Sequence, residues 1–140
     1  MTEDRMTNLI EGLLGTESLD LGAFEAAIGT ALKKTDENPS WAFYEFDFTD
    51  QPFARGELRL AKAKPAALLS LWPDDSELIA RDKLDLDRWG EVINIDVNPR
   101  IEPEGTVAYV YEVDGARLSF QFNYASETLR SVAIAWSSPD

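Results

Sequence analysis

The fold is decided by residues 106–124, which read Thr-Val-Ala-Tyr-Val-Tyr-Glu-Val-Asp-Gly-Ala-Arg-Leu-Ser-Phe-Gln-Phe-Asn-Tyr. Two alternating runs flank Asp114-Gly115, a dipeptide typical of the two-residue turn of a β-hairpin. Such a turn sets the register, so we expect Val113 to pair with Ala116 and Tyr109 to pair with Phe120. One face of the hairpin is then almost wholly apolar, which predicts that it packs against a core.

Further strands are expected on both sides of this hairpin. Residues 41–48 and 56–62 form a second predicted hairpin, in which Glu45 lies opposite Arg59. Residues 91–97 form a strand with Ile93, Ile95 and Val97 on one face. The last strand, residues 129–136, extends the apolar face of the central hairpin if Val132 lies opposite Phe122.

Helices are predicted at the start and in the middle of the chain. Apolar residues recur at helical spacing over residues 7–14 and 20–34. Residues 65–72 begin with a proline suited to the first helical turn and end before Pro73, which indicates a short helix. Residues 1–6 are expected to be a frayed N-terminus, and residues 74–90 show no clear period.

These elements predict one α+β domain over residues 1–140. We expect a curved antiparallel sheet of about five or six strands, with two N-terminal helices and a short middle helix packed on it, in the order αα-ββ-α-ββββ. This order is similar to that of nuclear-transport-factor-2-like (NTF2-like) proteins, and the resemblance implies a cone-shaped sheet around a small-molecule pocket. In that alternative the pocket is lined by aromatic side chains, namely Tyr109, Tyr111, Phe120, Phe122 and Trp136.

The composition excludes several chemistries. The chain has no cysteine and no histidine, so it lacks a thiolate nucleophile, a zinc-thiolate site and the commonest general base. It also lacks the glycine-rich phosphate-binding motifs and the Gly-x-Ser-x-Gly motif of hydrolases. We therefore expect a non-enzymatic protein without cofactor or metal. A carboxylate enzyme using Glu45 and Asp47, or a divalent-metal protein using Asp74-Asp75-Ser76-Glu77, is a remote alternative.

The net charge restricts the partners. It is −13 over 140 residues, and so acidic a chain repels phosphate backbones and anionic membranes. No apolar run approaches the ~20 residues of a membrane span. The N-terminus does not resemble a signal peptide, so a cytoplasmic protein is expected. The sequence leaves open whether it is a monomer or a homodimer.

Residues 74–104 form an acidic zone with 10 acidic and 4 basic residues. Such a surface steers a basic protein partner, although it is also typical of a solvated face that keeps a protein soluble. We predict a protein-binding module, and its concrete form is an immunity-type inhibitor of a basic toxin or nuclease. The candidate residues are acidic or aromatic: Asp74, Asp75, Glu77, Asp85, Asp87 and Trp89, with Trp41, Glu45 and Asp47 as a second patch. Core burial is expected for Trp72, and a helix is expected to cover Trp41 and Phe43.

Overall fold

The computed structural model of the chain describes residues 2–16, 19–48, 53–63, 65–73, 79–98, 100 and 105–136. Its helices are α1 (Thr2–Leu14) and α2 (Leu21–Ile28), followed later by two short 3₁₀ turns, η1 (Arg81–Lys83) and η2 (Leu86–Trp89). Its strands are β1 (Lys33–Glu37), β2 (Trp41–Asp47), β3 (Phe53–Ala61), β4 (Ala67–Pro73), β5 (Asn94–Asn98), β6 (Thr106–Val113), β7 (Ala116–Asn123) and β8 (Leu129–Trp136).

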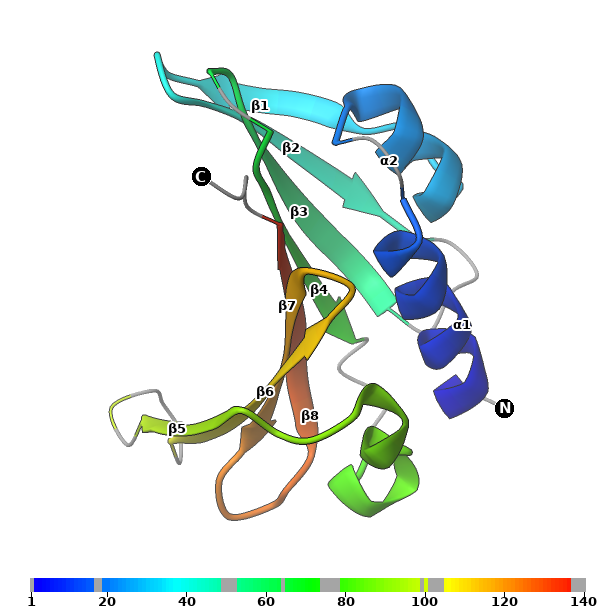
Figure 1. Cartoon of the computed structure of the whole chain (residues 1–140), viewed down its shortest axis with the longest axis vertical. Coiled ribbons are helices and arrows are strands. Elements are labelled where there is room, and N and C mark those ends of the chain that lie inside the picture. Colours follow the sequence, from blue (N-terminus) through cyan, green and yellow to red (C-terminus); the bar gives the residue numbers. More distant parts are fainter. Residues whose placement is uncertain are drawn as a thin grey trace.

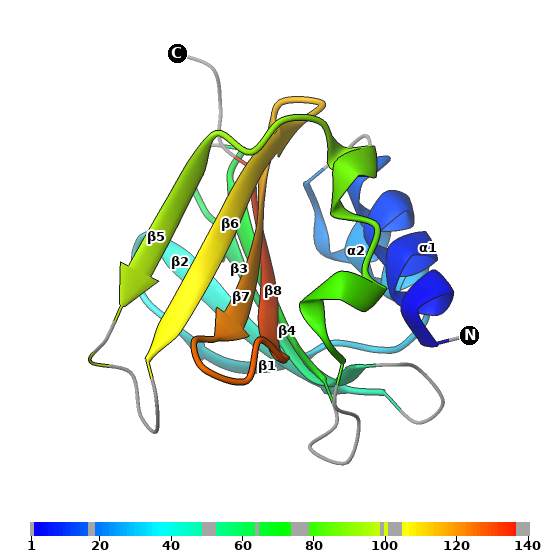
Figure 2. The same ribbon diagram turned by 90° about the horizontal axis from the view of Figure 1, so that it is seen from below.

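The eight strands form one antiparallel sheet in the order β1-β2-β3-β4-β8-β7-β6-β5. The first four strands and the last four are two meanders, which meet where β4 pairs with β8. The sheet bends strongly, and α1, α2 and the 3₁₀ turns lie on the same side of it (Figures 1 and 2). We call this side the inner face and the opposite side the outer face.

This architecture corrects the predicted fold class. The sheet has eight strands instead of five or six, and the order αα-ββ-α-ββββ is wrong. The sheet does not close into the cone of the NTF2-like comparison, because β1 and β5 remain at its two edges. Two α-helices, rather than three, accompany it in the described part of the chain.

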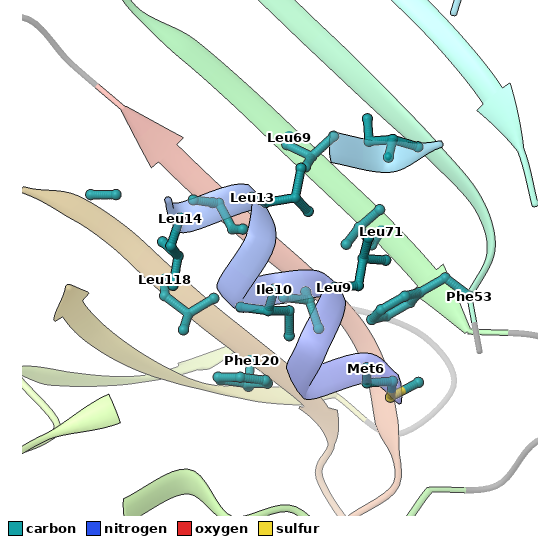
Figure 3. Close-up of a cluster of buried hydrophobic side chains, with 14 of the residues drawn as sticks. Met6, Leu9, Ile10, Leu13, Leu14, Phe53, Leu69, Leu71, Leu118 and Phe120 are labelled. Carbon is teal, nitrogen blue, oxygen red and sulfur yellow. The ribbon is translucent and has the colours of Figure 1, made fainter. Parts of the chain in front are cut away.

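Helix α1 lies across the seam between the two meanders. Figure 3 shows the apolar side chains of α1 turned toward those of β4 and β7. Leu13 of the helix is fully buried, as are Leu69 and Leu71 of β4 and Leu118 of β7. The core of the molecule is therefore the space between this helix and the middle of the inner face.

The central hairpin is confirmed. Val113 pairs with Ala116 and Tyr109 with Phe120, as the two-residue turn requires. Asp114 and Gly115 both have positive φ, of 51° and 83°, which is the backbone of a type I′ turn. The residues of the turn were sufficient to predict the register of this hairpin, because both strands continue directly from the turn.

The predicted middle helix is wrong, since residues 67–73 form β4. Ala67, Leu69 and Leu71 are buried on the inner face, and the residues between them point outward. A stretch this short between Pro65 and Pro73 fits a strand as well as a helix. The stretch forms a strand because it pairs with β3 on one side and with β8 on the other.

The second helix is shorter than predicted, because α2 ends at Ile28. Gly29 follows with a φ of 85°, the left-handed conformation that ends helices. Asp20 caps the start, where its carboxylate accepts a hydrogen bond of 2.8 Å from the Ala23 N–H. The residues after Gly29 are then free to form the edge strand β1, which the sequence did not predict.

Two strand registers differ from the prediction. Glu45 lies opposite Glu57 rather than Arg59, because β2 and β3 pair two residues away from the expected register. Val132 lies opposite Phe120 rather than Phe122, again a difference of two residues, and a bulge after Gln121 places Phe122 opposite Leu129. Neither shift changes which residues face inward, because the side-chain period of a strand is two.

Gly56 and Phe46 form a specific contact between β2 and β3. They lie opposite each other, and the ring of Phe46 covers the position that a Cβ on Gly56 would take. We predict that Gly56→Ala displaces this ring and lowers the free energy of unfolding by about 1–3 kcal/mol. Gly12→Ala is the control. Its Cβ would meet nothing within 4 Å, so it should stabilise α1 by up to about 1 kcal/mol. Urea unfolding of both variants measures this, and equal effects would contradict the packing.

Candidate protein-binding surface

Strand β5 lies at one edge of the sheet, beyond the cover of the helices (Figure 2). All five of its residues are exposed. Ile95 and Val97 pair with Tyr109 and Val107 of β6, so their side chains project from the inner face. They are 50% and 57% exposed, and Ile93, just before the strand, is 49% exposed. We call Val92, Ile93, Ile95 and Val97 the apolar edge.

The packed core ends at β6, the strand next to this edge. Tyr109 of β6 makes an edge-to-face contact with Phe122, with ring centroids 5.8 Å apart. The guanidinium of Arg81 lies over the Tyr109 ring, 5.4 Å from its centroid. Cover from the loop before β5 therefore reaches Tyr109 but leaves Ile95, its neighbour in the sheet, half exposed.

The loop that covers β6 carries four exposed carboxylates. We call residues 82–91 the acidic segment, and its acids are Asp82, Asp85, Asp87 and Glu91. None of these four forms an ion pair with the described residues.

Its arginine, by contrast, is neutralised from another element. Arg88 Nη2 lies 2.9 Å from Glu11 Oε2 of α1, and just before the segment Arg81 Nη2 lies 2.8 Å from Glu127 Oε1. With Arg88 paired to α1, the four carboxylates of the acidic segment face one basic residue of the segment, Lys83, that has no ion pair in the described part of the chain.

Asp87 belongs to the 3₁₀ turn η2, which contacts β6. Burial raises the pKa of the Tyr111 phenol above its ordinary value, and the negative charge of Asp87 raises it further. A charge acts in this way only at short range. The acidic segment and the apolar edge therefore border the same part of the sheet.

The other predicted residues of this region differ from one another in exposure. Asp85 is exposed like Asp87. Trp89 is only 8% exposed and packs against Phe120, with ring centroids 6.3 Å apart, so it belongs to the core. Asp74, Asp75 and Glu77 lie outside the described residues.

The second predicted patch, Trp41, Glu45 and Asp47, lies on the outer face of β2. No described helix covers this face (Figure 1), which corrects the expectation of a covering helix. Trp41 is half-buried, whereas Glu45 and Asp47 are exposed. An open hollow of about 220 Å³ is lined in part by Phe43 and Glu45.

Positive charge is interleaved with the acids of this outer-face patch. Lys33 of β1 lies opposite Glu45, and Arg59 lies 5.3 Å from the centroid of the Phe43 ring. Arg55 lies 4.2 Å from the centroid of the Trp72 ring, and Trp72 is on the outer face rather than in the core. The basic side chains of this patch therefore offset its carboxylates, whereas the four carboxylates of the acidic segment outnumber its two basic residues, Lys83 and Arg88.

The aromatic residues of the pocket alternative pack against other rings. Tyr111, Phe120 and Phe122 are buried, and Tyr109 and Trp136 are partly buried against the same core. Tyr111 contacts Phe120 at 6.1 Å and Trp136 contacts Phe24 at 5.2 Å between ring centroids. This packing gives no support to a small-molecule pocket at these positions.

Two further findings concern metals and membranes. Within the described ranges, no three or more Asp and Glu side chains are grouped so that they could hold a metal ion. No helix in the same part of the chain has the length and apolar character needed to span a bilayer.

The apolar edge was not recognised from the sequence. The alternation of this stretch predicted a strand with Ile93, Ile95 and Val97 on one face. The pairing of Ile95 and Val97 with residues of β6 confirms the strand and the shared face of these two residues. An apolar strand face is ordinarily buried. Only the strand order shows that this one lies at an edge, and no local pattern encodes that order.

We predict that Asp87→Asn lowers the pKa of Tyr111, while burial still holds it above the ordinary value. An ultraviolet absorbance titration measures the ionisation, and Tyr111→Phe assigns it. Because the phenol ionises at lower pH in the unfolded chain, its burial stabilises the fold below pH ~10, and this contribution is lost as the pH rises further. Asp85→Asn is the matched control and should leave the titration unchanged. An equal shift in both variants would contradict the placement of Asp87.

Comparison with known proteins gives a likeness of fold. No family model matches the chain, and no curated protein matches it. Among solved structures, it is similar to the crystal structure of a DUF4309 family protein (YjgB) from Bacillus subtilis subsp. subtilis str. 168. The sequences are 15% identical, the TM-score is 0.59, and the match covers 97% of this chain and 98% of that chain. At this identity, the likeness shows that the two chains share a fold.

Proposed function

We propose that the chain is a non-enzymatic module that binds a basic protein partner through the apolar edge and the acidic segment. One observation carries the proposal. Of the large apolar side chains exposed in the described residues, four of five belong to the apolar edge, and the fifth is Tyr124. Exposed apolar residues gathered in one place and bordered by polar residues are characteristic of protein interfaces.

The charges support a basic partner. The carboxylates of the acidic segment lack ion-pair partners in the described part of the chain, and the whole chain carries a net charge of −13. A surface of this kind raises the association rate of an oppositely charged protein by about 10–10³. An immunity-type inhibitor of a basic toxin or nuclease is the concrete role that fits this chemistry.

The acidic segment is favoured over the outer-face patch. Both expose carboxylates, but Lys33, Arg55 and Arg59 offset those of Glu45 and Asp47. The outer-face patch also lacks the large exposed apolar side chains found at β5. Of these two surfaces, the apolar edge with its neighbouring acidic segment offers a basic partner both electrostatic attraction and apolar burial.

We predict that Asp85→Lys with Asp87→Lys weakens binding of the partner by lowering its association rate. The partner is captured on the immobilised chain at low and moderate salt, identified, purified and tested by surface plasmon resonance. We expect the double variant to reduce the association rate by about tenfold or more and to flatten its salt dependence.

The matched control is Glu45→Lys with Asp47→Lys, which changes the net charge by the same amount on the outer face. It should reduce the rate much less. A larger loss in this control would move the binding surface to the outer face. If no purified basic protein binds the wild-type chain at either salt concentration, the proposed function is wrong.

A further inference from the structure

The two edges of the sheet differ in how they are protected against pairing with another strand. Edge strands present unpaired backbone groups, and proteins commonly block them with charged residues, especially lysine. Strand β1 follows this pattern, since it reads Lys-Lys-Thr-Asp-Glu and all its residues are exposed. Glu37 is also held by ion pairs with Lys34 and Lys62. Strand β5 reads Asn-Ile-Asp-Val-Asn and carries only one charge.

Strand β5 also has the backbone of a pairing site. It pairs along its whole length with β6 on one side. On the other side no strand among the described residues pairs with it. Backbone N–H and C=O groups alternate between the two sides of a strand, so about half of those in β5 are available to a further strand.

The side chains of β5 specify what such a strand would carry. Ile95 and Val97 present apolar surface on the inner face, and a neighbouring strand would cover it with apolar residues at alternate positions. On the outer face, Asp96 stands between Asn94 and Asn98, and its carboxylate accepts a hydrogen bond of 2.9 Å from the Asn94 amide. A lysine or arginine opposite Asp96 would pair with its charge.

Charge also argues against a second copy of this chain as the occupant. Two copies would each bring a net charge of −13, together with the unpaired carboxylates of the acidic segment. Such like charges repel when they are brought to one interface. A basic segment is attracted by the same charges.

We infer that β5 accepts an extended segment of a partner protein as a ninth strand of the sheet, and that this segment alternates apolar with basic residues. This inference rests on the proposed function, because it specifies how the basic partner binds at the apolar edge. Main-chain hydrogen bonds supply affinity in this mode of recognition, and alternate side chains supply specificity.

The probe is a fluorescein-labelled peptide in which valine and lysine alternate, measured by fluorescence anisotropy. The same peptide with N-methyl groups on alternate residues keeps its charge and side chains but loses backbone donors on one edge. We expect the unmethylated peptide to bind at low salt and the methylated peptide to bind at least about tenfold more weakly. Equal binding of the two peptides, or no binding of the first, would overturn the inference.

Two protein variants locate the binding. Ile95→Lys should weaken binding by about tenfold or more, whereas Thr35→Lys adds the same charge to the other edge strand and should change it less than about twofold. Both positions are exposed, and circular dichroism checks that both variants fold. If Ile95→Lys does not fold, Val97→Lys, at a more exposed position, replaces it. Equal binding by the β5 and β1 variants would overturn the inference.

Binding measurements with the natural partner distinguish a failure of this inference from a failure of the proposed function. If its binding depends on Asp85 and Asp87 but is unchanged by Ile95→Lys, the proposed function stands and strand addition is wrong. If the peptide binds β5 but no basic protein partner exists, the proposed function is wrong. A concentration-dependent dimer that Ile95→Lys abolishes would make a second copy the occupant and overturn the inference.

Discussion

Burial of the apolar side of α1 against the seam between two meanders is the interaction on which the rest of the structure depends. Leu13 of α1 and Leu69, Leu71 and Leu118 of the sheet are each fully buried there, and burial of one such side chain contributes about 1.5–3 kcal/mol. A helix of this length is marginal in water by itself. Helix and sheet therefore depend on each other, because each covers the apolar face of the other (Figure 3).

The same arrangement explains why one edge of the sheet remains uncovered. One helix across the seam covers only the middle strands of an eight-stranded sheet (Figures 1 and 2). The loop between β4 and β5 extends this cover to β7 through Trp89, which packs on Phe120, and to β6 through Arg81, which lies over Tyr109. Strand β5 lies one strand further out, and its apolar side chains have no described element above them.

Helix α1 also links the fold to the proposed binding surface. The ion pair between Glu11 and Arg88 joins the helix to the acidic segment. This ion pair is exposed, so it contributes little to stability. Its larger effect is electrostatic, because it neutralises one of the few positive charges near Asp85 and Asp87. The core thus positions the segment, and the ion pair leaves its carboxylates dominant.

Local sequence patterns predicted the parts of the fold that depend on near neighbours along the chain. The turn at Asp114-Gly115 determined the register of its hairpin, because the two strands are adjacent in sequence. Strand β4 could not be distinguished from a helix, since its pairing with β8 joins residues about 65 positions apart in the chain. The apolar spacing of residues 20–34 continues past Gly29, but the left-handed backbone of that glycine ends the helix at Ile28.

The candidate surface was predictable only in part for the same reason. The exposure of Asp85 and Asp87 follows from their charge. The burial of Trp89 depends on Phe120, which lies in a distant strand. That Ile95 and Val97 are exposed depends on the order of strands in the sheet. Residues whose environment is set by strand order cannot be assigned from a local pattern.

Amide hydrogen exchange of β5, with and without the alternating valine–lysine peptide, tests the central claim most directly. The account predicts that the amides of Asn94 to Asn98 facing away from β6 exchange rapidly in the free chain, because they have no strand partner. Saturating peptide should slow their exchange and leave the exchange of β1 unchanged. Protection of all β5 amides in the free chain, or equal slowing in β1 and β5, would contradict the account.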